Sequence, residues 1–319
     1  MSDIWVGVDV SKARLDVAVR PTGETWSVAN DANGIKQLTK VLKKQTLRLI
    51  VLEATGGYEQ AVTLSLKKVG LSVAVVNPRQ VRSFARALGR LAKTDPIDAK
   101  LLAHFGEAVQ PTAKPSPDQP SIELNQLVTR RRQLVEMLVA ERNRRLSAIA
   151  AVQRDIEAIV RFLERRLAKI DSEIQKRMNE HPEWRGKAQL LETVPGVGAV
   201  LISTLLADLP ELGSLTGKQA AALVGVAPFN NDSGTCRGRR RIWGGRSYLR
   251  SLLYMSVVSG LRWNYKIRDF YQHLLAAGKA PKVAIVACMR KLIIILNAML
   301  HSQQAWRAES ASCPAAALA

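Results

Sequence analysis

The sequence is poor in the residues that build metal–sulfur sites and disulfides. It has only three cysteines and four histidines in 319 residues. The cysteines (Cys236, Cys288 and Cys313) have no metal-ligand spacing, and the histidines are scattered. A zinc site or a disulfide framework is therefore not expected, which agrees with a protein of the reducing cytoplasm.

Secretory and membrane-spanning patterns are also missing. The N-terminus has no basic region followed by an apolar core. The apolar stretch from Val283 to Leu300 carries Arg290 and Lys291 in its middle. We interpret it as an amphipathic packing helix, so no membrane partner is expected.

A glycine-rich phosphate loop is absent after the first apolar run, because Gly7-Val8-Asp9 lacks the required glycine spacing. Three strand patterns come first, and helices and strands then alternate. A doubly wound nucleotide-binding fold would place a helix directly after its first strand. The order predicts an α/β ribonuclease-H-like domain, with strands at 4–10, 15–20, 24–29, 47–53 and 71–76 and helices near 34–44 and 58–69.

Acidic residues are few relative to basic ones. Lys and Arg number 47 against 27 Asp and Glu, which gives a net charge of +20 and a pI near 10.3. Such an excess favours a polyanionic partner, most often nucleic acid. A ribosome-associated or merely very soluble protein is the alternative.

Four of the acids occupy informative positions. Asp9 lies inside an apolar strand, Glu53 ends another, and Asp95 and Asp98 stand three apart at the start of a helical stretch. An unpaired acid is costly in an apolar strand, and a divalent cation would offset that cost. Oxygen-only ligands favour Mg²⁺ or Mn²⁺.

Basic residues with helical spacing lead directly to Asp95. They form either a solvated helix face or a track for phosphates that delivers nucleic acid to the acids. Lys12, just after the first strand, is a further candidate contact to DNA or a turn residue. The candidates in this part of the chain are Lys12, Arg79, Arg82, Arg86, Arg90 and Lys93.

The remaining sequence divides at a proline-rich linker over 111–120. Residues 1–110 precede it, and a long helical region over 121–185 follows. Its apolar positions step by three or four, which predicts a helical hairpin or coiled coil that serves as an intramolecular or a dimerisation arm. Residues 186–305 form a mainly helical C-terminal domain, and 306–319 a disordered tail.

Two glycine-containing segments of the C-terminal domain are candidates for phosphate contact. Pro195-Gly196-Val197-Gly198 precedes an apolar helix and resembles half of a helix-hairpin-helix module, with Gly196 and Gly198 at the turn. The second segment interleaves glycines with arginines, whose forked guanidinium groups bind phosphate oxygens. Its candidates are Arg237, Arg239, Arg240, Arg241 and Arg246, and Ser233 beside them is either a turn residue or a nucleophile.

The motifs together resemble one known family. Gly7-Val8-Asp9-Val10-Ser11-Lys12, Glu53-Ala54-Thr55-Gly56-Gly57-Tyr58 and Lys93-Thr94-Asp95-Pro96-Ile97-Asp98 look like the N-terminal domain of the insertion sequence 110 family of transposases, whose four-acid DEDD set resembles that of RuvC-type resolvases. The Pro-Gly-Val-Gly turn and the Ser233-Gly234 segment resemble that family's C-terminal transposase domain. The resemblance covers nearly the whole chain in the right order.

The resemblance implies site-specific DNA recombination guided by a structured RNA of the element, the bridge RNA. Asp9, Glu53, Asp95 and Asp98 would then bind the metal, and Ser233 would form a transient phosphoserine link to DNA. The implied partners are donor DNA, target DNA and a second or further copies of the chain, in a dimer or tetramer of a bacterial, nucleoid-associated protein. Since the acids and Ser233 lie on opposite sides of the helical arm in sequence, we expect either a folded-back arm or sites shared between subunits.

Three other functions remain open from the residues. The first is a metal-dependent nuclease or junction resolvase in which water attacks and Ser233 is a turn residue. The second is a non-catalytic RNA- or DNA-binding protein. The third is an actin-like ATPase, which needs further glycine-rich phosphate loops that the sequence lacks.

Overall fold

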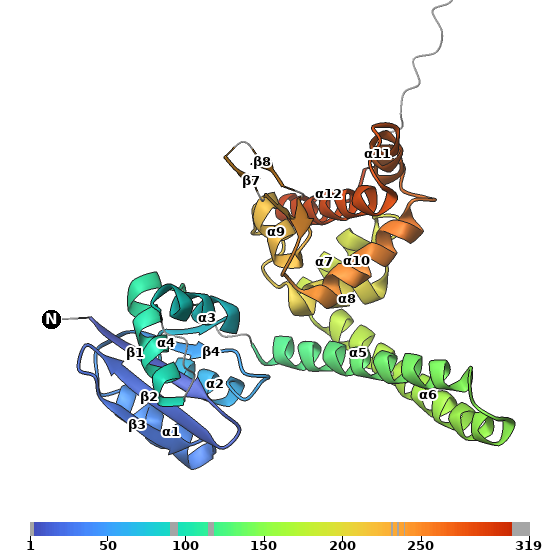
Figure 1. Cartoon of the computed structure of the whole chain (residues 1–319). Coiled ribbons are helices and arrows are strands. Elements are labelled where there is room, and N and C mark those ends of the chain that lie inside the picture. Colours follow the sequence, from blue (N-terminus) through green and yellow to red (C-terminus); the bar gives the residue numbers. More distant parts are fainter. Residues whose placement is uncertain are drawn as a thin grey trace, which may run out of the picture. The chain divides into compact units, whose positions relative to one another are not determined.

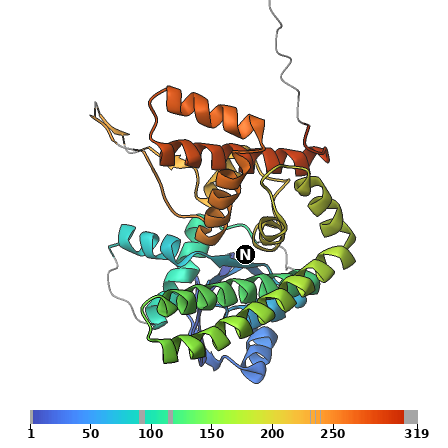
Figure 2. The same ribbon diagram turned by 90° about the vertical axis from the view of Figure 1, so that its right-hand side faces the viewer.

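The computed structural model describes residues 3–89, 95–113, 118–230, 232–234, 236–238 and 240–307. The chain forms two compact units, Met1–Pro117 and Asp118–Ala319, and each is described by itself (Figures 1 and 2). The finer division into five parts stays a prediction.

The first unit is built on a five-stranded mixed sheet. Its spatial order is β3-β2-β1-β4-β5, in which β1 pairs antiparallel with β2 and parallel with β4. The three consecutive strands predicted at the start of the chain are confirmed, and the predicted strand at 71–76 begins two residues later than expected. The strands are β1 Ile4–Val10, β2 Arg14–Arg20, β3 Thr25–Ala29, β4 Leu47–Glu53 and β5 Val73–Val76.

Alternate side chains of the strands pack on opposite faces of this sheet. Val6 and Val8 belong to the cluster that includes side chains of α1 (Ala32–Leu42) and α2 (Gln60–Lys68). Trp5 and Val51 instead belong to the cluster formed with α3 (Pro78–Ala87) and α4 (Asp95–Val109). The sheet is thus covered by two helices on each face (Figure 1).

Helix α4 lies directly on the middle of β1. A Cβ atom at Gly7 would stand 2.2 Å from the Ala99 carbonyl oxygen and 2.3 Å from the Ala103 nitrogen. Farther along α4, a Cβ at Gly106 would stand 2.9 Å from Cγ2 of Val51. Only glycine, which has no side chain, allows the helix and the sheet to approach so closely at these two positions.

These contacts also fix the direction of α4. The helix passes Gly7 near its start and Trp5 near its end, since the Gly106 position faces both Val51 and Trp5. Near the same end, Arg20 Nε is 2.7 Å from Glu107 Oε2. Arg20 lies opposite Trp5 in the β1–β2 pairing. The first turn of α4 therefore lies toward the C-terminal ends of β1 and β4.

The basic segment after β5 begins with helix α3. Asn77 caps α3 by accepting a hydrogen bond from the Arg79 nitrogen (2.9 Å), and Pro78 occupies the first turn. The helix ends at Ala87, and Gly89 adopts a left-handed conformation with φ 71°. The helical spacing predicted over 79–93 is confirmed up to Ala87, and residues 90–93 lie outside the described residues.

Two long helices open the second unit. They are α5 (Gln119–Arg145) and α6 (Ala150–Glu180), which pack through Leu134, Leu138 and Leu163. This arrangement confirms the predicted helical hairpin. The hairpin starts inside the predicted linker, because the Asp118 side chain accepts from the Ser121 nitrogen at 3.1 Å and caps α5.

Helices α7, α9, α10 and α11 pack against α12, whose side chains run through the core of the second unit. By length and hydropathy α12 could cross a membrane, yet 56% of its apolar window is buried within the protein. The helix packs against its neighbours, as the sequence predicts. The helices are α7 Pro182–Glu192, α8 Ala199–Asp208, α9 Gly217–Val224, α10 Ser247–Gly260, α11 Tyr265–Ala276 and α12 Pro281–Ser302.

Substitution of Gly7 tests the close contact between α4 and β1. We expect Gly7→Ala to lower the free energy of unfolding of the first unit by about 3 kcal/mol, because the new methyl group meets helix backbone. The measurement is denaturant unfolding followed by circular dichroism.

The matched control is Gly186→Ala, at an exposed position of α7 with nothing near its Cβ. That change should be neutral or stabilising by up to about 1 kcal/mol. Equal stability of the Gly7→Ala variant and the wild type would contradict the packing described above.

Candidate functional site: an acidic sheet edge and an exposed serine hairpin

Two of the predicted acids end neighbouring strands of the sheet. Gly7 is in register with Val51 and Val8 with Leu52, so Asp9 and Glu53 follow side by side on parallel β1 and β4. Asp9 comes four residues after Trp5, and Glu53 comes two residues after Val51, so both point to the sheet face on which Trp5 and Val51 pack against α3 and α4. Their side chains therefore share one face and one edge of the sheet.

The other two acids begin the helix that crosses this face. Asp98 immediately precedes Ala99, whose carbonyl oxygen lies over Gly7. Gly7 in turn lies two residues before Asp9 on the same strand face. Asp95 is the first residue of α4, but its side chain lies outside the described part. The ends of β1 and β4 and the start of α4 thus lie toward the same end of the sheet, and we refer to this region as the acidic edge. That the four carboxylates meet at one point stays a prediction.

Carboxylates of this kind suit a hard divalent cation, because every donor is an oxygen. Among the described residues, no three His, Cys, Asp or Glu side chains gather closely enough to hold a metal ion. Asp9, Glu53 and Asp98 each take part in other interactions. The chemistry of the donor set fits a divalent ion, and a complete set of ligands stays a prediction.

Short hydrogen bonds order the loops beside the acidic edge. The Glu59 carboxylate accepts from the nitrogens of Thr55 (3.0 Å) and Gly57 (2.9 Å), which holds the segment that follows Glu53. Ser11 Oγ donates to the Arg14 carbonyl at 2.9 Å and closes the β1–β2 turn. Lys12 is exposed on this turn, where a contact to DNA stays a prediction.

A fifth acid on the same face was missed by the sequence analysis. Asp16 lies opposite Asp9 in the β1–β2 pairing and is only 5% exposed. Its carboxylate accepts from Arg14 Nε at 2.8 Å and from Ser27 Oγ, and these partners offset the cost of burial. The signal was present in the sequence as an acid between the apolar residues of a predicted strand.

The basic residues predicted to lead toward the acids are partly described. Arg79 and Arg86 are exposed on α3 and Arg82 is half-buried, while Val81 and Ala85 pack against the sheet. Arg90 and Lys93 lie outside the described residues. The outer face of α3 is therefore basic, as expected of a surface that meets phosphate groups.

In the second unit, Ser233 belongs to a short β-hairpin. Strand β7 (Asp232–Ser233) pairs antiparallel with β8 (Cys236–Arg237), and Ser233 is opposite Cys236. Ser233 is exposed, and Gly234 follows with φ 55°. Both ribbon views show the hairpin standing out from the helices of its unit (Figures 1 and 2). A hydroxyl group in this position is open to a large substrate.

The arginines near this hairpin differ in their surroundings. Arg240 and Arg241 are exposed, and Arg241 lies in β9 (Arg241–Ile242), which pairs with β6 (Pro228–Phe229). Arg246 Nη2 is 3.7 Å from Glu211 Oε2. Arg237 is part of β8, and Arg239 lies outside the described residues.

One glycine of this segment, Gly245, has a packing role. A Cβ at Gly245 would lie 2.3 Å from the Gly225 nitrogen, whereas Gly244 has open space beside it and its carbonyl accepts from Arg250 Nη1 at 2.6 Å. Gly245 thus allows close approach to the end of α9, although its segment was predicted to contact phosphate.

The Pro-Gly-Val-Gly turn likewise makes a close contact within the protein. A Cβ at Gly196 would lie 2.7 Å from the Cα of Gly260 in α10. Gly198 is exposed as the N-cap of α8, with open space beside it. Gly196 is therefore needed for packing, and phosphate contact at this turn stays a prediction.

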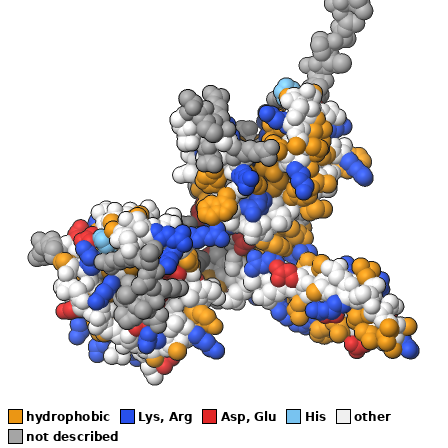
Figure 3. Space-filling view, viewed as in Figure 1, with side chains coloured by type: hydrophobic (Ala, Val, Ile, Leu, Met, Phe, Trp, Pro, Cys, Tyr) orange, Lys and Arg blue, Asp and Glu red, His pale blue; other side chains and the backbone are white. Residues whose placement is uncertain are grey.

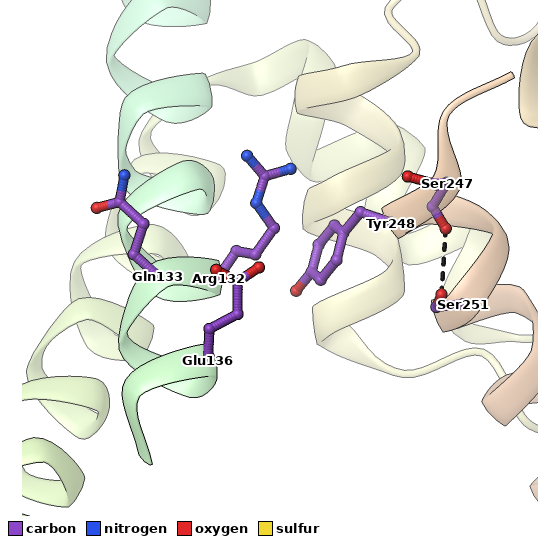
Figure 4. A pocket seen from close by; sticks show the side chains of 6 residues that line it. All are labelled: Arg132, Gln133, Glu136, Ser247, Tyr248 and Ser251. Atoms are coloured by element: carbon purple, nitrogen blue, oxygen red, sulfur yellow. Dashed lines mark hydrogen bonds between the residues drawn. The ribbon is translucent and has the colours of Figure 1, made fainter. Parts of the chain in front are cut away.

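A polar pocket of about 410 Å³ opens between α5 and α10 (Figure 4). Arg132 extends from α5 toward Tyr248, with its guanidinium carbon 5.2 Å from the ring centroid. Burial raises the pKa of Asp208 in α8, while the positive charges of Arg132 and Arg246 act to lower it. Sequence periodicity could not reveal this pocket, because its walls lie far apart along the chain. It is lined by Arg132, Gln133, Glu136, Ser247, Tyr248 and Ser251.

Comparison with known families places both regions in one enzyme class. A family model for a DEDD domain, described as a transposase, matches residues 6–152. A second, described as "Transposase IS116/IS110/IS902 family", matches residues 188–272. The chain belongs to the IS110 family of transposases. Asp9, Glu53, Asp95 and Asp98 fall in the first match, and Ser233 falls in the second.

Two similar proteins align with nearly the whole length of this chain. The pilin gene-inverting protein of Moraxella lacunata is 29% identical over 316 residues, which is 95% of this chain and 98% of that protein. The protein of the same name from Moraxella bovis is also 29% identical, with the same coverage. An uncharacterized 42 kDa protein of insertion element IS900 from Mycobacterium paratuberculosis is 28% identical over 149 residues, which is 44% of this chain and 35% of that protein.

These findings make the chain an enzyme that acts on DNA as a transposase or recombinase. Its DEDD domain indicates dependence on a divalent metal. The basic surface is consistent with a DNA partner, since Lys and Arg side chains greatly outnumber acids on the face drawn in Figure 3.

Substitution of the acids tests the acidic edge. We expect Asp9→Asn, Glu53→Gln and Asp98→Asn each to lower the rate of DNA strand cleavage about 100-fold or more, because each removes a negative ligand and keeps side-chain volume. The exposed Asp155→Asn in α6 is the control and should cleave at the wild-type rate. Wild-type cleavage by the three acid variants, measured on labelled DNA with folding verified by circular dichroism, would rule out the assigned role.

Proposed function

We propose that this transposase cuts and rejoins DNA through a phosphoserine intermediate at Ser233, with divalent-metal assistance from the acidic edge and guidance by a structured RNA. The observation that carries this proposal is an exposed serine on a projecting hairpin, beside exposed arginines. Family membership and the basic charge support it.

The fold of the first unit supports a ribonuclease-H-like, RuvC-like assignment. Its strand order of 3-2-1-4-5, with the first three strands antiparallel and β4 and β5 parallel to β1, is the arrangement expected of that fold. The acids at the ends of β1 and β4 and at the start of α4 agree with it. We also assign the α5–α6 hairpin as a coiled-coil arm, which its alternating apolar seam supports.

In the proposed reaction, Ser233 Oγ attacks the phosphorus of the scissile phosphodiester. The Oγ–P bond forms as the bond from phosphorus to the departing sugar oxygen breaks. The serine loses its hydroxyl proton and the sugar oxygen gains one, so no net charge or redox change occurs. Attack by the sugar hydroxyl of another strand then reverses the step and joins new ends. The phosphoserine ester retains the bond energy, and rejoining needs no external energy source.

The chain's arginines have a defined task in this reaction. Exposed Arg240 and Arg241 lie close in sequence to Ser233, where their positive charge would hold the phosphodiester and stabilise negative charge on it. The carboxylates of Asp9, Glu53, Asp95 and Asp98 would hold Mg²⁺ or Mn²⁺. The bound ion would neutralise the negative charge that develops on the phosphate.

The proposed partners are donor DNA, target DNA and a bridge RNA that selects them by base pairing. A net charge of +20 gives the chain enough positive surface for several nucleic-acid strands. Because recombination joins two DNA partners, we propose a homo-oligomer, a dimer or tetramer, that acts at the bacterial nucleoid in the cytoplasm.

Trapping of a covalent adduct tests Ser233. We expect the wild-type protein with cognate RNA and labelled DNA to give a protein–DNA band that survives denaturation. Ser233→Ala should lose this band and lower strand cleavage by at least about a thousand-fold, because the attacking oxygen is absent.

The control is Ser172→Ala, which changes an exposed serine of α6 and should leave the adduct unchanged. Wild-type cleavage by Ser233→Ala without an adduct would overturn the proposal and assign the attack to water, as in a junction resolvase.

A further inference from the structure

The turn between α10 and α11 presents two aromatic rings to solvent. Trp263 is 71% exposed and Tyr265 is 60% exposed. Asn264 between them is only 2% exposed. Aromatic side chains bury large areas in most folds, so an adjacent exposed pair on a well-anchored turn is informative.

Buried contacts hold this turn in place. The Asn264 side chain accepts from the Ile267 nitrogen at 3.2 Å and donates to the Pro195 carbonyl at 3.3 Å. On the other side of the turn, Gly260 packs against the backbone of Gly196. The exposure of Trp263 and Tyr265 is therefore a property of an anchored turn that packs on the α7–α8 loop.

Basic side chains alternate with these rings. Arg268 lies over the Tyr265 ring, with its guanidinium carbon 4.8 Å from the centroid. Lys266 Nζ is 5.2 Å from the centroid of Trp306, whose backbone nitrogen donates to Thr193 Oγ1 at 2.9 Å. Trp306 thus joins the cluster from the end of the described chain.

The charge of this surface is strongly positive. Residues 262–268 contain three cations and no acid, and Asp269 follows with an ion pair of 3.7 Å to Arg268. Over α10, α11 and α12, Figure 3 shows hydrophobic side chains beside Lys and Arg. We define the aromatic–basic cluster as Arg262, Trp263, Tyr265, Lys266, Arg268 and Trp306.

We propose that the aromatic–basic cluster binds an unpaired stretch of nucleic acid. Exposed rings offer flat surfaces on which unpaired bases stack, and cations between them contact the phosphates. A duplex keeps its base faces stacked internally, so the rings favour a single strand. The phosphates of a nucleic-acid strand would complement the net positive charge of this surface, which a protein surface without acids would not.

This binding surface goes beyond the proposed strand-transfer chemistry. Its residues are separate from Ser233 and the acidic edge in sequence, and it acts on strands before or after they are cut. A failure of the proposal can therefore be told from a failure of the phosphoserine mechanism, because Ser233→Ala should bind single strands normally.

The test is binding of fluorescent single-stranded DNA and single-stranded RNA of one sequence to the full chain, measured by anisotropy at moderate salt. The Trp263→Ala/Tyr265→Ala variant should bind at least one of the strands about ten-fold more weakly, and Trp263→Phe should keep most of the affinity because a ring remains. The nucleic acid, DNA or RNA, whose affinity falls more is the one that this surface binds in the natural reaction.

Controls separate stacking from general charge. Phe162→Ala removes an exposed aromatic ring (52%) from α6 and should leave binding unchanged. Arg262→Gln/Lys266→Gln should reduce the salt dependence of binding, since fewer counterions are released. Unchanged affinity of the Trp263→Ala/Tyr265→Ala variant for both strands, or an equal loss for duplex DNA, would overturn the proposal.

Discussion

Direct contact between the α4 backbone and β1 at Gly7 is the constraint on which the acidic edge depends. The Ala99 carbonyl and Ala103 nitrogen occupy the space of a side chain there. Because the helix also passes Gly106 over Val51, its direction is fixed and its first turn lies toward the strand ends. Asp98 precedes Ala99, which contacts Gly7, and Asp9 lies two residues after Gly7 on the same strand. The two glycines thus orient α4 with its first turn toward the end of the sheet at which Asp9 and Glu53 lie, and the joining of the carboxylates in one metal site stays a proposal.

The same kind of contact recurs in the second unit, where glycines join loops to helices. Gly196 meets Gly260, and Gly245 meets Gly225. These contacts hold in place the turn that contains Trp263 and the loop that contains Arg246. Close backbone packing in the interior leaves charged and aromatic side chains free to face outward, which suits an enzyme whose substrates are long polyanions. Of the residues proposed to meet nucleic acid, Lys12, Ser233 and Trp263 lie on turns or on a hairpin, whereas Arg79, Arg82 and Arg86 lie along α3.

Much of the first unit could be predicted from the sequence, because its strands are continuous apolar runs and its acids interrupt or end them. Glu53 was predicted at a strand end and is the last residue of β4. Features set by pairwise contacts could not be predicted in this way. Helix α5 begins inside the predicted linker because the Asp118 side chain caps it. The burial of Asp16 depends on its hydrogen bonds with Arg14 and Ser27. Gly196 and Gly245 were related to phosphate because sequence alone does not reveal that protein backbone fills the space beside these two glycines.

The central proposal is that the α4–β1 contact positions the first turn of α4 so that the four acids can bind a divalent metal together. Anomalous diffraction from crystals grown with Mn²⁺ and bound DNA tests it most directly. The account predicts a manganese peak about 2–2.5 Å from carboxylate oxygens of Asp9 and Glu53 and within reach of the first turn of α4. Manganese bound elsewhere, with no peak at this sheet edge in crystals of protein that cleaves DNA, would contradict it.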